Sequence, residues 1–224
     1  MASNPVEDHV CNSIVLDSTH AISELCVFCA KSGTDKCVLR LDSGGHRHPY
    51  TVPYSLLFET MRRKPIKFLE LGVFRGASIV AWRQYFSKAR IYGYDNDVGA
   101  LSAIPTLPDV QCSRVDVSQR DELVAAFTRD TADGELFDIV LDDAAHDVTH
   151  QSLLIREGLR FVKPGGLLII EDVFRDRPES LYAPALEAAI AADLLSFYTF
   201  IVCDHRDRYS PGWNNDKMLV LFRK

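Results

Sequence analysis

Short apolar runs that end in acidic residues recur along the chain and alternate with segments of helical periodicity. Such alternation is typical of right-handed βαβ units and a parallel sheet. The last two apolar runs are joined by a loop with Pro211 and Gly212. That connection is too short for a parallel crossover, so these two strands should pair antiparallel. The predicted strands are, in order, IKFLELG, ARIYGYDND, VQCSRVDV, FDIVLDD, LLIIEDV, FYTFIVCDH and KMLVLFRK. We therefore predict an α/β fold with a doubly wound, mostly parallel seven-stranded sheet and an antiparallel last strand.

The N-terminal part has a different pattern. Up to about residue 30, apolar residues recur at spacings of three and four, which indicates an amphipathic helix; they include Ile14, Val15, Ile22, Leu25, Cys26 and Phe28. The segment from about 32 to 50 reads as loop. We predict a helical N-terminal cap over residues 1–55 and the sheet domain over residues 56–224, as one compact unit.

Composition limits the possible partners. The chain has 224 residues, 47% hydrophobic, which suits one domain with a sizeable core. A net charge of −6 argues against a nucleic-acid partner, since a phosphate backbone attracts Lys and Arg patches. No apolar run reaches 18 residues and the first residues do not resemble a signal peptide, so we expect a soluble, cytoplasmic protein away from membranes. The CxxC of Cys26 and Cys29 reads as buried thiols rather than a metal or redox site.

Acidic residues gather where the predicted strands end. In open α/β sheets, ligands bind beyond the carboxyl ends of the strands. An acid after a single strand often only caps the next helix, but repetition at five strands favours a ligand site. Like charges on one edge repel each other, so a compensating cation is expected. The acids are Glu70, Asp95, Asp116, Asp142, Asp143, Glu171 and Asp172.

The first βα turn indicates the ligand. Its glycines, Gly72 and Gly76, follow an E-x-G-x-x-x-G spacing rather than the G-x-G-x-x-G of dinucleotide sites. Glu70 would repel a pyrophosphate and suits a ligand that bears an ammonium and a sulfonium. Asp95 ends the second strand, where a carboxylate can accept both ribose hydroxyls, and Asp116 ends the third, near an adenine edge. These features predict S-adenosylmethionine.

Three further acids predict a metal. Asp143, Glu171 and Asp172 end two strands that should be adjacent, and an all-oxygen set suits Mg²⁺. His146 lies three residues after Asp143 and can act as a general base towards a metal-bound hydroxyl. The alternative for His146 is a local hydrogen bond at the start of a helix. For His150, one turn further on, the structural interpretation is favoured.

The sequence resembles the class I S-adenosylmethionine-dependent methyltransferases. Within them it is most similar to the metal-dependent macrolide sugar O-methyltransferases of the mycinamicin type and their relatives described as cephalosporin hydroxylases. The matching phrases cover the chain from about residue 33; they are GTDK, HPYTVPY, LELGVFRGAS, WRQYFSKARIYGYDND, DIVLDDAAH, KPGGLLIIEDV and WNNDKMLVLFRK.

The resemblance implies a Rossmann-like methyltransferase fold. It also implies the roles in metal binding, cofactor binding and catalysis that the acids and the histidine were assigned above. His146 is the base, and Asp143, Glu171 and Asp172 bind Mg²⁺. The GTDK segment and Tyr50 or Tyr54 would close over the cofactor. The predicted cofactor-binding residues are Thr34, Tyr54, Glu70, Gly72, Ser78, Asp95, Asp116 and Asp142. The chain departs from the family at two points. It has the sequence DDAAH, with Ala144 and Ala145, where relatives often have DDGSH. We also expect it to lack the large extra N-terminal domain of the macrolide enzymes.

Four functions remain open from the sequence. The first is an Mg²⁺-dependent O-methyltransferase acting on a hydroxyl of a sugar or polyketide-like natural product; the resemblance implies a homo-oligomer. The second is an oxidoreductase of the cephalosporin hydroxylase kind, although no 2-His-1-carboxylate set supports iron chemistry. The third is a cofactor-binding protein without catalysis, and the fourth a nucleic-acid methyltransferase. Trp213 and Tyr209 either line an apolar substrate pocket or pack against the sheet.

Overall fold

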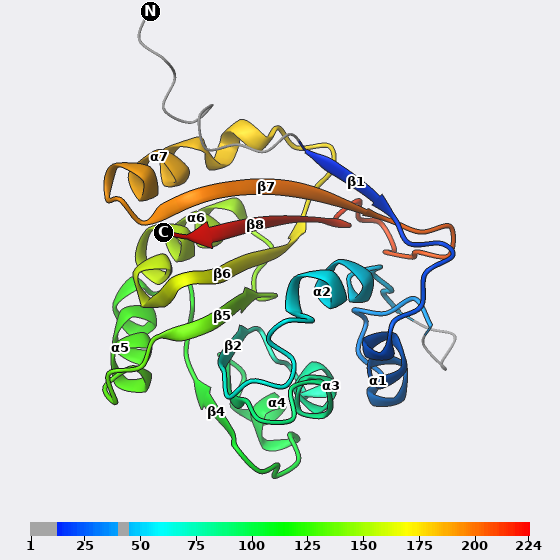
Figure 1. Ribbon diagram of the computed structural model, residues 1–224, viewed down its shortest axis with the longest axis horizontal. Helices are drawn as coiled ribbons and strands as arrows, with labels where there is room; N and C mark the ends of the chain where they lie inside the picture. The colour runs from blue at the N-terminus through cyan, green and yellow to red at the C-terminus, as the bar shows by residue number, and fades with distance from the viewer. Residues whose placement is uncertain (1–12, 40–44) are drawn as a thin grey trace, which may run out of the picture.

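The sheet contains all seven predicted strands and one more. A computed structural model describes residues 13–39 and 45–224, and in them one sheet has the strand order β1-β7-β8-β6-β5-β2-β3-β4 (Figure 1). The strands are β1 (Ile14–Asp17), β2 (Lys67–Leu71), β3 (Arg90–Asp95), β4 (Val110–Arg114), β5 (Phe137–Asp142), β6 (Val162–Val173), β7 (Leu195–Asp204) and β8 (Lys217–Arg223). The predicted α/β class is confirmed.

Strand directions also agree with the prediction. The neighbours of β2 and β5 are all parallel, whereas β8 runs antiparallel to both β6 and β7. The KPGG segment, expected to terminate a helix, instead belongs to β6, which starts at Val162. In the strand order, β8 lies between β7 and β6. The last strand in the sequence is therefore inserted between two earlier ones rather than added at an edge.

The expected N-terminal helix is wrong for its first residues. Ile14–Asp17 form the short edge strand β1, parallel to β7 (Figure 1). Four residues are too few for periodicity to separate helix from strand, and the β-branched Ile14 and Val15 favour an extended backbone. The helix begins later, with Ser23 as its N-cap.

Helices cover both faces of the sheet (Figure 1). Their bounds are α1 (Glu24–Ser32), α2 (Thr51–Phe58), α3 (Ala77–Tyr85), α4 (Val98–Ser102), α5 (Arg120–Asp130), α6 (Val148–Gly158) and α7 (Ala183–Ala191), with 3₁₀ turns η2 (Leu159–Phe161) and η3 (Glu179–Tyr182). One core contains Phe58 and Trp82 from α2 and α3, and the other contains Phe127 and Leu154 from α5 and α6. Two cores separated by one sheet are what a doubly wound fold requires.

Two smaller sequence expectations can be compared with this fold. Cys26 and Cys29 are buried on α1 as free thiols, which matches the preferred interpretation of the CxxC. Among the described residues, none of the helices has the length and apolar character needed to cross a bilayer.

Pairing of the central strands brings the acidic residues together. Asp142 of β5 is in register with Leu71 of β2 on one side and with Ile170 of β6 on the other. The residues that follow, Asp143 after β5 and Glu171 in β6, therefore lie at the same edge of the sheet.

Candidate metal and cofactor site

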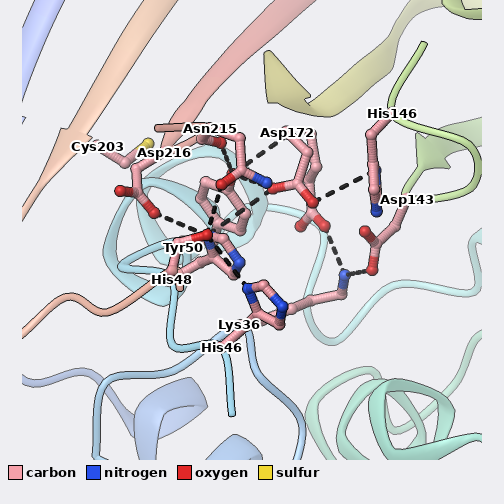
Figure 2. Close-up of polar contacts among 12 residues, drawn as sticks. Lys36, His46, His48, Tyr50, Asp143, His146, Asp172, Cys203, Asn215 and Asp216 are labelled. Atoms are coloured by element: carbon pink, nitrogen blue, oxygen red, sulfur yellow. Dashed lines mark hydrogen bonds and ion pairs between the residues drawn. The ribbon is translucent and has the colours of Figure 1, made fainter. Parts of the chain in front are cut away.

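Two predicted metal ligands and the predicted base converge at this edge. Asp143, His146 and Asp172 each offer a ligand atom, and these atoms lie within 4.8 Å of one another (Figure 2). Nδ1 of His146 lies 3.3 Å from Oδ2 of Asp172. Two carboxylates and an imidazole at this spacing can surround one divalent cation, or one cation with the imidazole beside it.

Glu171 faces a different neighbour. Its Oε2 accepts a hydrogen bond from Nζ of Lys36 at 2.5 Å, and its Oε1 accepts one from the hydroxyl of Tyr54. Burial raises the pKa of Glu171 well above its usual value. The predicted ligand Glu171 is therefore adjacent to the cluster of Asp143, His146 and Asp172, with both oxygens already hydrogen-bonded.

Lys36 supplies a cation that the sequence prediction left unidentified. Its side chain is 1% exposed, and its ammonium contacts Asp143 (Figure 2). The same ammonium contacts Glu171 and, at 3.3 Å, Glu70. Burial alone would lower the pKa of Lys36, but the three carboxylates outweigh it and the pKa lies well above the usual value. The ammonium contacts three acids and Asp172 lies beside them, so the carboxyl groups outnumber this one cation, and a divalent cation bound there would favour the ionised forms that burial disfavours.

The backbone is strained at the same place. His146 and Asp172 both have positive φ, 50° and 56°, and Phe74 of the first βα turn has φ 44°. Residues with a Cβ rarely adopt this conformation, and its cost is tolerated where the surrounding structure fixes a side chain for function. The left-handed turns direct the carboxylate and the imidazole towards each other.

Gly72 permits the close approach of two turns. It has φ +82°, and a Cβ added there would lie 2.1 Å from the backbone oxygen of Asp143. The peptide N–H of Asp143 donates to the carbonyl of Leu71 at 2.8 Å. The glycine turn after β2 and the acidic turn after β5 therefore pack backbone to backbone, and any larger residue at position 72 would separate them.

Two adjoining hollows lie against these turns. The first, about 300 Å³, contains Asp116, and the second, about 580 Å³, contains Thr34, Ser78, Asp143 and His146. Both are lined by Gly72, Asp95 and Ala144. Their volumes, and the lining residues that they share, suit a nucleoside with an amino-acid tail.

Asp95 and Asp116 are held in place by local hydrogen bonds. Oδ2 of Asp95 accepts from the N–H of Phe74 at 2.7 Å and Oδ1 from the N–H of Asp97 at 2.9 Å. Asp116 accepts from the N–H and hydroxyl of Ser118, which lowers its pKa. Asp95 stands where the two hollows meet, the position predicted for a ribose-binding carboxylate.

Three predicted cofactor residues do not line these hollows. Glu70 is buried and accepts hydrogen bonds from Ser78 at 2.7 Å and Trp82 at 3.2 Å, and burial raises its pKa to about 7. Asp142 is also buried, with its pKa raised to about 7. Tyr54 is buried, and its hydroxyl donates a hydrogen bond to Oε1 of Glu171. From these positions the three side chains support the site from behind rather than face a ligand.

A second polar network supports Asp172, and sequence reasoning missed it. The hydroxyl of Tyr50 donates to Oδ1 of Asp172 at 2.7 Å rather than closing over the cofactor. His48 stacks on Tyr50 and its Nδ1 lies 2.7 Å from Oδ1 of Asp216 (Figure 2). Burial would lower the pKa of His48, but the bond to Asp216 raises it. The signal in the sequence is the spacing of two from His46 through His48 to Tyr50, which places the three rings on one side of an extended segment.

Comparison with known proteins gives relatives of one kind. No family model matches the chain. A tetracenomycin-C rhamnosyl 3′-O-methyltransferase from Streptomyces olivaceus is 31% identical over 159 residues, which are 67% of this chain and 37% of that protein. Mycinamicin VI 2″-O-methyltransferase from Micromonospora griseorubida is 30% identical over 138 residues, 58% of this chain and 33% of that protein.

Solved structures agree with this result. A methyltransferase of the mycinamycin pathway, solved with Mg, SAH and mycinamycin VI, matches 91% of this chain and 55% of its own with a TM-score of 0.62 at 18% identity. The relatives' names all describe methyltransferases, so the oxidoreductase alternative has no support from them.

The chain spans a little over a third of the length of the first curated relatives it matches. Within that span, the resemblance seen in the sequence is confirmed. The chain is a homologue of the sugar O-methyltransferases of macrolide and tetracenomycin biosynthesis, with the Rossmann-like fold of the methyltransferases.

Proposed function

We propose that this chain is an S-adenosylmethionine-dependent, Mg²⁺-dependent O-methyltransferase that acts on a hydroxyl of a sugar or polyketide-like small molecule. The observation that carries the proposal is the convergence of Asp143, His146 and Asp172 beside a cavity that contains Asp95 and Asp116. An acid-rich cluster with one histidine, beside two hollows that share Gly72 and together are large enough for a nucleoside, suits methyl transfer from a sulfonium to a hydroxyl.

Asp143 and Asp172 would hold the metal. Glu171, predicted as the third ligand, would join them only if Mg²⁺ displaced Lys36 or Tyr54 from its oxygens. The fit rests on the donor set: carboxylate oxygens are the ligands that Mg²⁺ prefers, and the acidic side chains here outnumber the one ammonium of Lys36. When bound, Mg²⁺ makes a coordinated hydroxyl more acidic than it is in water.

His146 is the group that would take the hydroxyl proton. Its Nδ1 faces Asp172 at 3.3 Å, so a proton on Nδ1 leaves Nε2 as the accepting nitrogen. Asp172 is itself fixed by Tyr50. Tyr50 thereby holds the Asp172 carboxylate within ion-pair distance of the imidazole, to which it makes no hydrogen bond in this structure, and this carboxylate would stabilise the imidazolium formed when Nε2 takes the proton.

The cofactor would lie along the two hollows. Asp95, at their junction, would accept the ribose hydroxyls, Asp116 would lie by the adenine, and Thr34, Gly72 and Ser78 would line the methionine end. Glu70, Asp142 and Tyr54 would act through the residues they support. The acidic chain favours a small-molecule acceptor over a nucleic acid, and we place the protein in the cytoplasm.

Isothermal titration of SAH, with and without Mg²⁺, tests the proposal. We expect the wild type to bind SAH and, separately, to give heat with Mg²⁺ that D143N loses. D193N, which changes an exposed acid just after the end of α7, should behave as the wild type. Absence of SAH binding in the wild type would sink the proposal. SAH binding with identical Mg²⁺ heats in wild type and D143N would leave a methyltransferase without this metal site.

A further inference from the structure

The larger of the two hollows, about 580 Å³, offers a ligand both signs of charge. Its lining includes three acidic residues, Asp35, Asp95 and Asp143, and one arginine, Arg75. Among the described residues that line it, Arg75 is the only arginine or lysine. Asp95 and Asp143 already have proposed roles in binding the ribose and the metal, which leaves Arg75 and Asp35 unassigned.

The first βα turn presents Arg75 to this hollow. The guanidinium lies over the ring of Phe74, 5.2 Å from the ring centroid. Phe74 has a φ of 44°, and its N–H donates a hydrogen bond to Oδ2 of Asp95 at 2.7 Å. The backbone is therefore anchored one residue before Arg75. Within residues 13–39 and 45–224, Arg75 is exposed and forms no ion pair, so its charge is available to a ligand.

Asp35 reaches the same hollow from the segment that follows α1. Its carbonyl oxygen accepts a hydrogen bond from the N–H of His48 at 2.7 Å. The next residue, Lys36, is buried, and its ammonium lies 2.5 Å from Glu171. These two contacts fix the backbone of Asp35, while its half-buried side chain lines the hollow.

A pair of opposite charges on two fixed segments suits a zwitterion. A guanidinium binds a carboxylate through two parallel N–H groups, and a carboxylate accepts hydrogen bonds from an ammonium. A simple anion in this hollow would also meet the acids, and a simple cation would meet Arg75, so each would be repelled by part of the lining. An α-amino acid carries both charges on one carbon and can satisfy both sides.

We propose that Arg75 binds the carboxylate and Asp35 the ammonium of the cofactor's amino-acid tail. The inference rests on the proposed methyltransferase function and adds to it two residues that determine which sulfur-containing nucleosides bind. It predicts that the affinity of the protein for such nucleosides depends on both charged groups of the tail, which can be measured without turnover.

Three ligands test the two contacts separately in calorimetric titrations with Mg²⁺ present. They are SAH, decarboxylated SAH, which lacks the carboxylate, and desamino-SAH, which lacks the ammonium. The wild type should bind SAH most tightly, because only SAH makes both charge-assisted contacts.

Each variant should be insensitive to the loss of the group that it no longer binds. R75Q should bind SAH and desamino-SAH about tenfold more weakly than the wild type does and decarboxylated SAH equally well. D35N should bind SAH and decarboxylated SAH about tenfold more weakly and desamino-SAH equally well. A purely structural effect of either substitution would weaken all three ligands alike.

Two further variants calibrate the titrations. R206Q changes an exposed arginine after β7 that pairs with Asp207 at 3.3 Å, and it should bind all three ligands as the wild type does. D95N should weaken all three by the same factor, because they share the ribose.

The outcomes separate this inference from the proposed function. Absence of SAH binding in the wild type would overturn both. If the wild type binds SAH, but R75Q or D35N changes the affinity for all three ligands equally or for none, the role of that residue is wrong while the methyltransferase proposal stands.

Discussion

Nζ of Lys36 lies 2.5 Å from Oε2 of Glu171, and both side chains are almost completely buried. The pair joins the segment after α1 to β6, across a separation of 135 positions in the chain. The same ammonium also contacts Asp143 and Glu70, so one cation fixes the spacing of three acids before any metal binds. Lys36 therefore belongs to the site as much as the acids do.

Replacement of Lys36 by Met should destabilise the metal-free protein by about 3–5 kcal/mol, because removal of one partner leaves buried carboxylates unpaired. Mg²⁺ should restore part of that loss, since a bound divalent cation supplies the missing charge. Urea unfolding with and without Mg²⁺ measures both effects.

K67M is the matched control for K36M. Lys67 is equally buried, but its partner Asp133 is solvent-accessible, so Mg²⁺ should not rescue this variant. Unchanged stability of K36M, or equal rescue of both variants by Mg²⁺, would contradict the role assigned to Lys36.

Gly72→Ala should separate the turns after β2 and β5, because the new Cβ would overlap the Asp143 carbonyl. We expect loss of SAH binding and a destabilisation well above the roughly 1–2 kcal/mol that a left-handed residue costs alone. G134A provides that reference, since Gly134 has φ +81° and nothing within 4 Å of an added Cβ. Similar unfolding free energies for the two variants would show that the packing at position 72 is not tight.

Glu70 should make stability fall as the pH rises. Burial raises its pKa in the folded protein from 4.5 to about 7, so the folded state holds the proton more tightly. The ionisation of Glu70 therefore lowers the free energy of unfolding. This loss is absent below about pH 4.5, the pKa in the unfolded chain, grows between about pH 4.5 and 7, and reaches about 3 kcal/mol. Unfolding free energies of wild type and E70Q in EDTA should therefore diverge across this window, in favour of E70Q. The exposed Glu187, changed to Gln, should track the wild type, and a constant difference between E70Q and wild type would exclude this titration.

Tyr50→Phe should weaken Mg²⁺ binding about 10–100-fold, the usual effect of removing a hydrogen bond that orients a metal ligand. The hydroxyl of Tyr50 is the donor that fixes Asp172. Calorimetric Mg²⁺ titration measures the change. Y85F, in a buried tyrosine of α3 that packs on Phe86, is the control. Equal Mg²⁺ affinities in Y50F and wild type would show either that Asp172 is not a metal ligand or that the hydroxyl of Tyr50 does not orient it.

The sequence was most informative where chemistry follows regular structure. Seven apolar runs predicted seven strands, and all seven are present in the sheet. Because the carboxyl ends of parallel strands meet at one edge of a sheet, the sequence alone predicted that the acids lie together there. Asp143 and Asp172 converge with His146 as the spacing suggested. The roles of these residues in binding metal and proton remain predictions.

What escaped prediction lies outside regular elements or depends on side-chain direction. Lys36 and His48 come from loop segments, whose path in space has no local code. Glu70 and Tyr54 occur in matching motifs but point behind the cavity, and a motif does not specify which way a side chain faces. The strand β1 was missed because four residues carry too little periodicity.

The position of β8 has a consequence for how the protein is made. This strand is inserted between β6 and β7, and Asn215 and Asp216 immediately before it complete the network around Tyr50 and His48. A ribosome releases these residues only after every other strand has emerged. Until then β6 has an open edge, and β7 with β1 has no partner linking it to the rest of the sheet. The acidic site therefore cannot be completed on a nascent chain until β8 has emerged, and until then the open edge of β6 is available for pairing with other chains.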